Sequence, residues 1–176
     1  MNCTSVTLSR IDGRCDTNTG GIKRIYIALN DDVVSVTQDN DTSDGMITAI
    51  TMADTKKFIA WDFRPNTGAY SSTTSTDPAI GNSSVTTEVT LQFTKAEATK
   101  RLSIQSAINA GAKVIVEDQY GQYIYLGHDS DVYITSATMQ SGTARTDLNG
   151  FNITFQDISN ELPYFVEKSA VEAVIV

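Results

Sequence analysis

The chain has 176 residues, 40% of them hydrophobic, and its 13 Lys and Arg against 21 Asp and Glu give a formal net charge of −8. This length and apolar content predict one folded domain, and the acidic balance disfavours general binding to nucleic-acid phosphates. No stretch approaches the ~18 apolar residues of a membrane span, and the opening MNCTSVTLSR lacks the pattern of a signal peptide. We therefore expect synthesis and assembly in a cytoplasm, with Cys3 and Cys15 as free thiols rather than a disulfide.

The first part of the chain divides into an arm and a run of short strands. Residues 1–21 are polar and rich in glycine, which predicts an irregular N-terminal arm ahead of one domain at 22–176. Alternation of apolar and polar residues then predicts short antiparallel strands joined by tight turns. These strands are expected at 22–29, 33–37, 46–52 and 57–63.

The middle of the chain contains a long polar stretch and the predicted helix. Residues 64–84 are rich in Ser, Thr, Gly and Pro, which predicts a long exposed loop, either a simple surface insertion or a segment ordered by a neighbouring subunit. Regular alternation at 85–93 predicts a strand. Thr94 and Glu97 have the spacing of a capping box, so a helix is expected at about 95–110, with Gly111 ending it.

The last third again predicts strands. A hairpin is expected at 114–127 with its tip at Tyr120 and Gly121, followed by strands at 131–139 and 151–158. After Pro163, the apolar ending SAVEAVIV predicts a final strand that is buried or lent to a neighbour. The fold class is therefore mainly β: an antiparallel β-sandwich or barrel with one flanking α-helix.

Residues with catalytic or ligand-binding chemistry are sparse. His128, the sole histidine, lies beside Asp129 and Asp131 in a predicted turn, where turn geometry explains it better than a metal does. The stretch DNDTSDG lacks the glutamate of a calcium loop, and no phosphate-binding loop, dinucleotide motif or nucleophile elbow is present. We expect no enzyme, no cofactor and no metal. Tyr123, Tyr125 and Tyr133 are expected to flank the core or to form a contact surface.

Residues 116–166 resemble a pattern in structural proteins of tailed bacteriophages, especially crAss-like phages and others that infect Bacteroidales. The similarity consists of a hairpin with D-x-x-G-x-Y-x-x-G, a strand, then S-G-x-x-x-x-D-x-N-G-[FY]-x-I-T-F and a later proline. The matching residues are Asp118, Gly121, Tyr123, Gly127, Ser141, Gly142, Asp147, Asn149, Gly150, Phe151 and Pro163. The upstream strand, helix and strand are also similar to tail-tube and tail-connector proteins, which are β-sandwiches with one flanking helix that assemble into rings.

This resemblance implies a virion protein that forms a homo-oligomeric ring in the tail, or in the neck between portal and tail. Its expected partners are copies of itself, neighbouring tail, neck or portal proteins, and DNA that passes through the lumen without specific binding; no membrane is expected. An acidic balance would suit such a channel. A capsid auxiliary protein and a carbohydrate- or cell-surface-binding β-sandwich are the alternatives. The residues expected at interfaces are Asn66, Tyr70, Ser141, Arg145, Asp147, Val174 and Val176.

Overall fold

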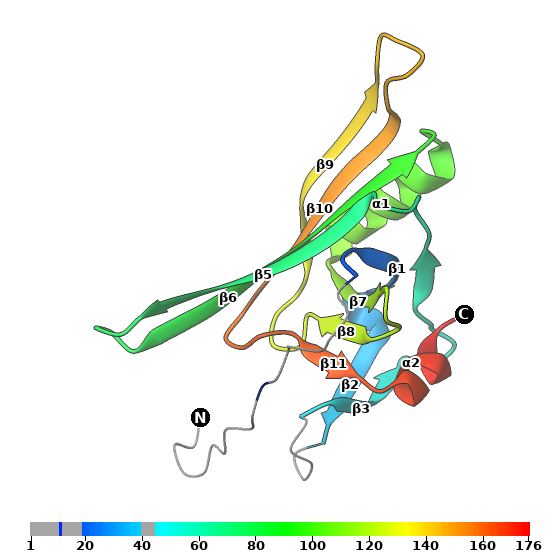
Figure 1. Ribbon diagram of the computed structural model, residues 1–176. Coiled ribbons are helices and arrows are strands. Elements are labelled where there is room, and N and C mark those ends of the chain that lie inside the picture. Colours follow the sequence, from blue (N-terminus) through cyan, green and yellow to red (C-terminus); the bar gives the residue numbers. More distant parts are fainter. Residues whose placement is uncertain (1–10, 12–18, 40–44) are drawn as a thin grey trace.

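The computed structural model describes residues 11, 19–39 and 45–176, and the described residues form two β-sheets with helices packed beside them (Figure 1). Most of the expected N-terminal arm therefore lies outside the described residues. The strands are β1 (Ile22–Leu29), β2 (Val33–Gln38), β3 (Ile47–Met52), β4 (Ile59–Trp61), β5 (Gly68–Asp77), β6 (Asn82–Thr94), β7 (Ala112–Asp118), β8 (Tyr123–Leu126), β9 (Tyr133–Ser141), β10 (Asn149–Ser159) and β11 (Tyr164–Val166). The helices are the short 3-10 helix η1 (Asn30–Asp32), α1 (Ala98–Ala110) and α2 (Lys168–Val174).

The first sheet has seven strands in the order β2-β3-β11-β8-β7-β1-β4. In its middle, β7 pairs antiparallel with β1 on one side and with β8 on the other, while β3 and β11 pair in parallel. The strands predicted at 22–29, 33–37, 46–52 and 57–63 are confirmed as β1 to β4, although β4 is shorter than predicted.

The second sheet has four long strands in the order β5-β6-β10-β9, all antiparallel. It consists of two hairpins, β5–β6 and β9–β10, joined through the pairing of β6 with β10. The hairpins are longer than the sandwich, so the β5–β6 tip and the β9–β10 tip project beyond it on different sides (Figure 1).

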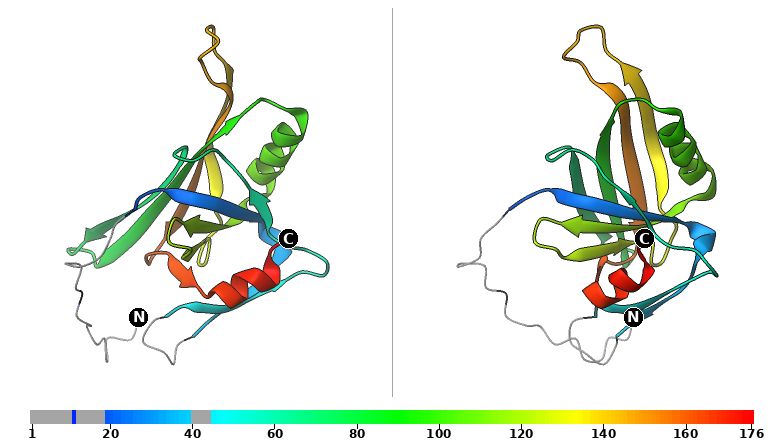
Figure 2. Two further views of the ribbon diagram at one scale, coloured as in Figure 1. Left: turned by 45° about the vertical axis from the view of Figure 1, so that its right-hand side comes forward. Right: turned by 90° about the vertical axis from the view of Figure 1, so that its right-hand side faces the viewer.

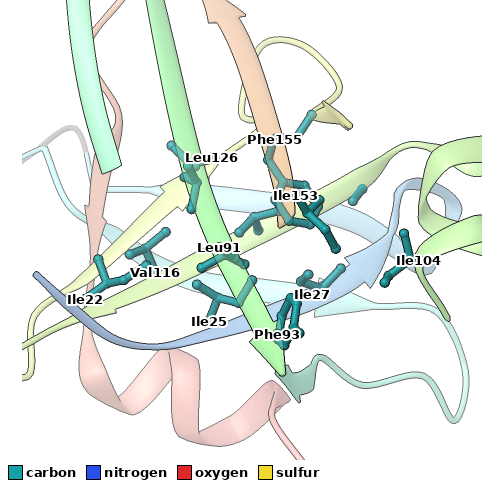
Figure 3. Packing of buried hydrophobic residues seen from close by; sticks show 14 of the residues in the cluster. Ile22, Ile25, Ile27, Leu91, Phe93, Ile104, Val116, Leu126, Ile153 and Phe155 are labelled. Atoms are coloured by element: carbon teal, nitrogen blue, oxygen red, sulfur yellow. The ribbon is translucent and has the colours of Figure 1, made fainter. Parts of the chain in front are cut away.

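The main core lies between the two sheets. Alternate residues of β6 and β10, such as Leu91, Phe93 and Ile153, face Ile25 and Ile27 of β1 across the sandwich (Figure 3). Trp61 packs its ring against Phe93 at a centroid distance of 5.7 Å. The period-two alternation read from the sequence therefore has its usual cause, because alternate side chains of a strand point to opposite faces. The predicted sandwich is confirmed among the described residues, as two sheets that do not close into a barrel.

The first sheet is also covered on its other face. Helix α2 packs there against a second cluster that includes Phe58, Ile115 and Tyr125 (Figure 2). The strand predicted for the C-terminal SAVEAVIV is wrong, because residues 168–174 are helical and only Ile175 forms a bridge, to Phe58. Ala170, Val171 and Val174 fall on one face at helical spacing, and all three are buried.

The long loop predicted at 64–84 is also wrong. Its residues 68–77 form β5, and residues 82–84 begin β6, with an unbroken register from Gly68↔Leu91 to Asp77↔Asn82. The turn at the tip is closed by the Asp77 carboxylate, which accepts a hydrogen bond from the Ala79 backbone N–H at 2.9 Å. The distal strands are made of Ser and Thr because they project past the core and have no apolar surface to cover.

Helix α1 confirms the predicted helix but begins later than expected. Its N-cap is Glu97, which caps no backbone group and instead pairs with Lys95 and Lys100, so the capping box is wrong. Gly111 ends the helix as predicted, at a φ of 69° that favours glycine. The helix buries Ile104 and Ala107 against the sandwich and leaves Leu102 exposed.

Candidate assembly surfaces

The second sheet ends in two edge strands whose outer sides have no pairing partner among the described residues. One is β5, with the sequence GAYSSTTSTD, and the other is β9, with the sequence YITSATMQS. Edge strands of soluble proteins are commonly protected by lysine, proline or a bulge. Neither strand contains Lys or Pro, Asp77 is the one charged residue in them, and the bulge in β9 lies near its start, beside Thr135. Both edges are therefore open to pairing with another strand.

The directions of these edges restrict how two copies could join. Because the four strands alternate in direction, β5 and β9 run opposite to each other. Placing β5 of one copy beside β9 of the next would give an antiparallel pair and leave the next β5 and β9 free. A contact of this kind joins two different surfaces and repeats from copy to copy, which generates rings or helical filaments.

The outer face of the second sheet is polar and nearly uncharged. Away from the core, β6 presents Thr86, Glu88, Thr90 and Gln92, and β10 presents Asn152, Thr154 and Gln156. The Gln156 amide donates a hydrogen bond to the Glu88 carboxylate at 3.0 Å. A shallow hollow on this face is lined by Thr67, Thr90, Gln92, Ser136, Asn152 and Thr154. No Lys or Arg belongs to β5, β6, β9 or β10, so this face offers no cation to a phosphate backbone.

The β9–β10 turn, residues 142–148, contains two of the residues that carry the resemblance, Gly142 and Asp147, and a third, Gly150, follows at the start of β10. The Asp147 carboxylate accepts a hydrogen bond from the Ala144 N–H at 2.8 Å and closes the turn. A Cβ on Gly142 would lie 1.9 Å from the Asp147 Cβ, and a Cβ on Gly150 would lie 1.9 Å from the Phe93 carbonyl oxygen. Gly142, Asp147 and Gly150 are therefore accounted for by the geometry of the hairpin.

The D-x-x-G-x-Y-x-x-G motif has a similar structural basis. The Asp118 carboxylate accepts hydrogen bonds from the N–H groups of Tyr120 and Gln122, each at 2.8 Å, and Gly121 has a φ of 76°. Gly127, with a φ of 91°, donates its N–H to the buried Asp157 at 3.0 Å. Asp118, Gly121 and Gly127 therefore each have a local structural role, in the β7–β8 turn or in the connection to β9.

Sequence reasoning missed a polar network beneath the turn that contains His128. Ser130 donates to Asp157 at 2.7 Å, and the Lys113 ammonium donates to the carbonyls of Gly127 and Ser130 at 2.6 and 3.1 Å. The alternation of β10 places Asp157 on the buried face, so a carboxylate at a core position was the one available signal. Among the described residues, no three His, Cys, Asp or Glu side chains are grouped so as to hold a metal ion, while the DNDTSDG stretch lies mostly outside them.

The residues predicted at interfaces lie on three separate parts of the fold. Asn66, at a φ of 63°, and the half-exposed Tyr70 lie at the beginning of the β5 edge. Burial, followed by the charge of Asp118, raises the pKa of Tyr70. Ser141, Arg145 and Asp147 are exposed at the β9–β10 tip.

The C-terminal pair differs from the other predicted interface residues. Val176 is exposed, but Val174 is 5% exposed and packs in the second cluster, so it is not a surface residue of this chain. Of the two alternatives expected for the C-terminal segment, buried or lent to a neighbour, Val174 is buried within its own chain.

The tyrosines divide between core and surface. Tyr123 and Tyr125 are buried in the second cluster, and Tyr133 is exposed on β9. None of the described helices is long and apolar enough to cross a membrane.

Comparisons with known proteins leave the family of this chain open. No protein-family model matches it, and no curated protein does. Among solved structures, it is similar to a chain from the virion of a native gene transfer agent particle, at 11% identity and a TM-score of 0.33, over 86% of this chain and 88% of that chain. A likeness with this TM-score carries no argument about fold or function. The function is therefore inferred from the surfaces of the chain itself.

Proposed function

We propose that the chain is a structural virion protein of a tailed bacteriophage, a subunit of a ring in the tail or in the neck between portal and tail. The observation that carries this proposal is the pair of open, oppositely directed edges of the second sheet, β5 and β9. Repeated pairing of these edges would make one continuous antiparallel sheet from many copies. The sequence resemblance of residues 116–166 supports the virion context.

The outer face of the second sheet supports the role of a DNA conduit. In a ring closed through β5 and β9, one face of this sheet lines the inside, and the opposite face is already covered by the core. The free face carries hydroxyl and amide groups, the carboxylate Glu88 and no cation in its four strands. Because protein cations supply most non-specific DNA binding, such a face would let DNA slide past without holding it.

Two edge variants test the proposed contact. Thr73→Lys places a charge on the β5 edge, and Thr138→Lys places one on the β9 edge, whereas Thr90→Lys, on the central strand β6, is the matched control. We expect the unmodified chain and Thr90→Lys to form rings, measured by light scattering over a concentration series and imaged by electron microscopy. Each edge variant alone is expected to be monomeric.

Mixing the two edge variants distinguishes this contact from others. Each retains one intact edge, so a β5-to-β9 contact predicts that the mixture forms dimers containing one copy of each and nothing larger. Dimers of either variant by itself would indicate a symmetric edge contact and contradict the ring. A monomer at every concentration for the unmodified chain would also contradict it, in favour of the capsid auxiliary or surface-binding alternatives.

A further inference from the structure

The turn at the end of the β5–β6 hairpin is apolar, although the strands that lead to it are polar. Residues 78–81 read Pro-Ala-Ile-Gly, and the Ile80 side chain is 73% exposed. In the strands beside this turn, residues 71–77 and 82–84 are all Ser, Thr, Asp or Asn. Because an isoleucine side chain gains free energy when it leaves water, this tip would be stabilised by an apolar site on another molecule.

An open groove of about 280 Å³ between strand β4 and helix α1 has the character of such a site. The buried residues Phe93 and Ile104 form its floor, and Ile59 and Trp61 line its strand side. Lys100 lies on its helix side. Ile59 is 60% exposed, which is high for an isoleucine beside a core. The groove therefore offers apolar surface with a cation at its rim.

The groove is suited to side chains rather than to an added strand. Just before β4, the Phe58 N–H donates to the Val174 carbonyl at 2.9 Å, and the Val176 N–H donates to the Phe58 carbonyl at 3.2 Å. The backbone at Phe58 is thus already paired within the chain, so an incoming segment would be held by the burial of its side chains. A narrow turn with an isoleucine at its end meets this requirement better than an extended segment.

The tip cannot reach the groove of its own chain. Strand β5 leads from the β4 side of the groove to the tip, and its 10 residues span roughly 33 Å at about 3.3 Å per residue. Unbroken pairing with β6 keeps β5 extended, and the tip and helix α1 lie on opposite sides of the molecule (Figure 1). Only a second copy can bring an Ile80 side chain to this groove. A contact between two such unlike surfaces repeats from copy to copy.

The charges at the two ends of the second sheet are complementary. At the end beside the groove, the segments 62–67, 95–101 and 142–148 contain more cations than carboxylates: Arg64, Lys95, Lys100, Arg101 and Arg145 against Asp62, Glu97 and Asp147. Each of these carboxylates already has a partner within the chain. At the end beside the tip, the segments 77–81, 127–132 and 160–163 contain no Lys or Arg and four carboxylates: Asp77, Asp129, Asp131 and Glu161. Lys113 reaches this end from β7 and pairs with Asp131 at 3.3 Å. The acidic end of one copy would therefore be attracted to the basic end of the next.

We propose that the β5–β6 tip of one copy docks through Ile80 in the groove between β4 and α1 of a second copy, with the acidic end of the first copy against the basic end of the second. This inference rests on the proposed ring and adds a contact between one ring and the next. A single tip buries little surface, so separate copies bind each other weakly and the edge variants remain monomers. A ring presents one tip per copy, and these contacts act together.

A disulfide between two variants of the full chain tests the contact. Both variants carry Cys3→Ser and Cys15→Ser; one adds Ile80→Cys, and the other, enlarged by a tag, adds Ser103→Cys at the groove. The control replaces Ser103→Cys by Gln105→Cys, an exposed position on the opposite side of α1. Under mild oxidation we expect the mixed dimer to form at least about tenfold faster with Ser103→Cys than with Gln105→Cys, and added salt to slow it. Equal rates would overturn the inference.

Substitution at the tip separates this contact from the ring itself. Ile80→Asp and Asn82→Asp add the same charge at the same tip, but only the first removes the apolar side chain. Light scattering and electron microscopy should show separate rings for Ile80→Asp, and rings associated end to end for Asn82→Asp and the unmodified chain. Equal association of the two variants would contradict the docking.

The two experiments also distinguish this inference from the proposed function. Rings that give no selective disulfide would overturn the docking and leave the ring standing. A selective disulfide between copies that never close into rings would support the docking and contradict the ring.

Discussion

At the scale of single residues, two buried tyrosine hydroxyls of the first sheet have opposite environments. The Tyr26 hydroxyl donates to the buried carboxylate Glu117 at 3.1 Å, and Lys23 pairs with the same carboxylate at 2.5 Å. The Tyr125 hydroxyl is buried and has no hydrogen-bond partner among the described residues. Since an unpaired buried polar group costs free energy, the two hydroxyls should contribute to stability with opposite signs.

Replacing each tyrosine by phenylalanine tests this difference. Tyr125→Phe is expected to leave the free energy of unfolding unchanged or to raise it by up to about 1 kcal/mol, because it removes an unsatisfied group. Tyr26→Phe should lower it by about 1–2 kcal/mol, because Glu117 loses a donor. Urea unfolding of both variants measures the two changes, and equal losses would contradict the difference in environment.

The raised pKa of one tyrosine, Tyr164, predicts how the stability of the fold changes as the pH becomes alkaline. Burial, then the hydrogen bond to Glu161, raises the pKa of Tyr164 to about 12. A folded-state pKa above the unfolded value of about 10 means that this contribution is complete below pH 10 and is lost between pH 10 and 12. Tyr164→Phe should therefore flatten the fall in melting temperature over that window. An identical fall in the variant would assign the effect to other groups.

Gly150 is required by close packing rather than by a turn. A Cβ there would lie 1.9 Å from the Phe93 carbonyl oxygen, a backbone atom that cannot rotate away. Gly150→Ala is expected to lower the free energy of unfolding by about 1–3 kcal/mol or more. Gly20→Ala is the matched control, since no atom lies within 4 Å of its added Cβ, and it should change stability by less than about 0.5 kcal/mol. A harmless Gly150→Ala would show that β6 and β10 can separate locally.

At the scale of elements, strands that face the core on one side were predictable. In β1, β6 and β10 apolar and polar residues alternate because one face of each strand is buried. This alternation predicted where the three strands lie in the sequence. Strand β5 and the first residues of β6 were missed because the distal half of their hairpin, beyond Thr74, has no core to face and leaves no apolar pattern. Helix α2 was missed because a run of seven residues with Val and Ala fits a strand as well as a short helix.

The candidate surfaces were less predictable than the strands. Residues at the β9–β10 tip and at the beginning of β5 could be named from turn chemistry. Which strands end a sheet depends on pairings between distant segments, and no local pattern reports those.

Shortening the β5–β6 hairpin separates its role in folding from its role in assembly. Replacing residues 76–83 by Asn-Gly keeps the pair Ser75↔Ser84 and removes a tip whose Ile80 is 73% exposed. The melting temperature should fall by less than about 4 °C, because few buried contacts are lost. Ring formation, followed by light scattering, should weaken clearly. A large loss of stability with unchanged assembly would mean that the tip supports the fold instead.

At the scale of the whole molecule, the net charge of −8 is distributed so that the free face of the second sheet has almost none of it. Acidic residues elsewhere would keep the particle soluble. The passage of DNA would then depend on hydroxyl and amide groups, which exchange hydrogen bonds with water and do not hold phosphate.

Adding cations to this face tests that view. Rings with Thr90→Lys and Thr154→Lys should retain DNA at low salt, with binding that weakens steeply as salt rises. Rings with Gln105→Lys and Ser106→Lys, which add the same charge at exposed positions of helix α1, should behave like the unmodified protein. Gel-shift assays over a salt series measure both. DNA retention by the helix variants alone would place the conduit on a different surface.

The bulge in β9 has a consequence for the size of any ring. A contact between two unlike edges contains no symmetry axis that stops growth, so the copy number is set by the angle between successive copies. The bulge lies in one of the two joined edges, beside Thr135, and a bulge increases the local bend and twist of a strand. The inserted residue Thr135 would therefore help to set the number of copies in the ring. Deleting it to remove the bulge would change the angle between copies, and the assembly would become an open helix or a ring with a different number of subunits.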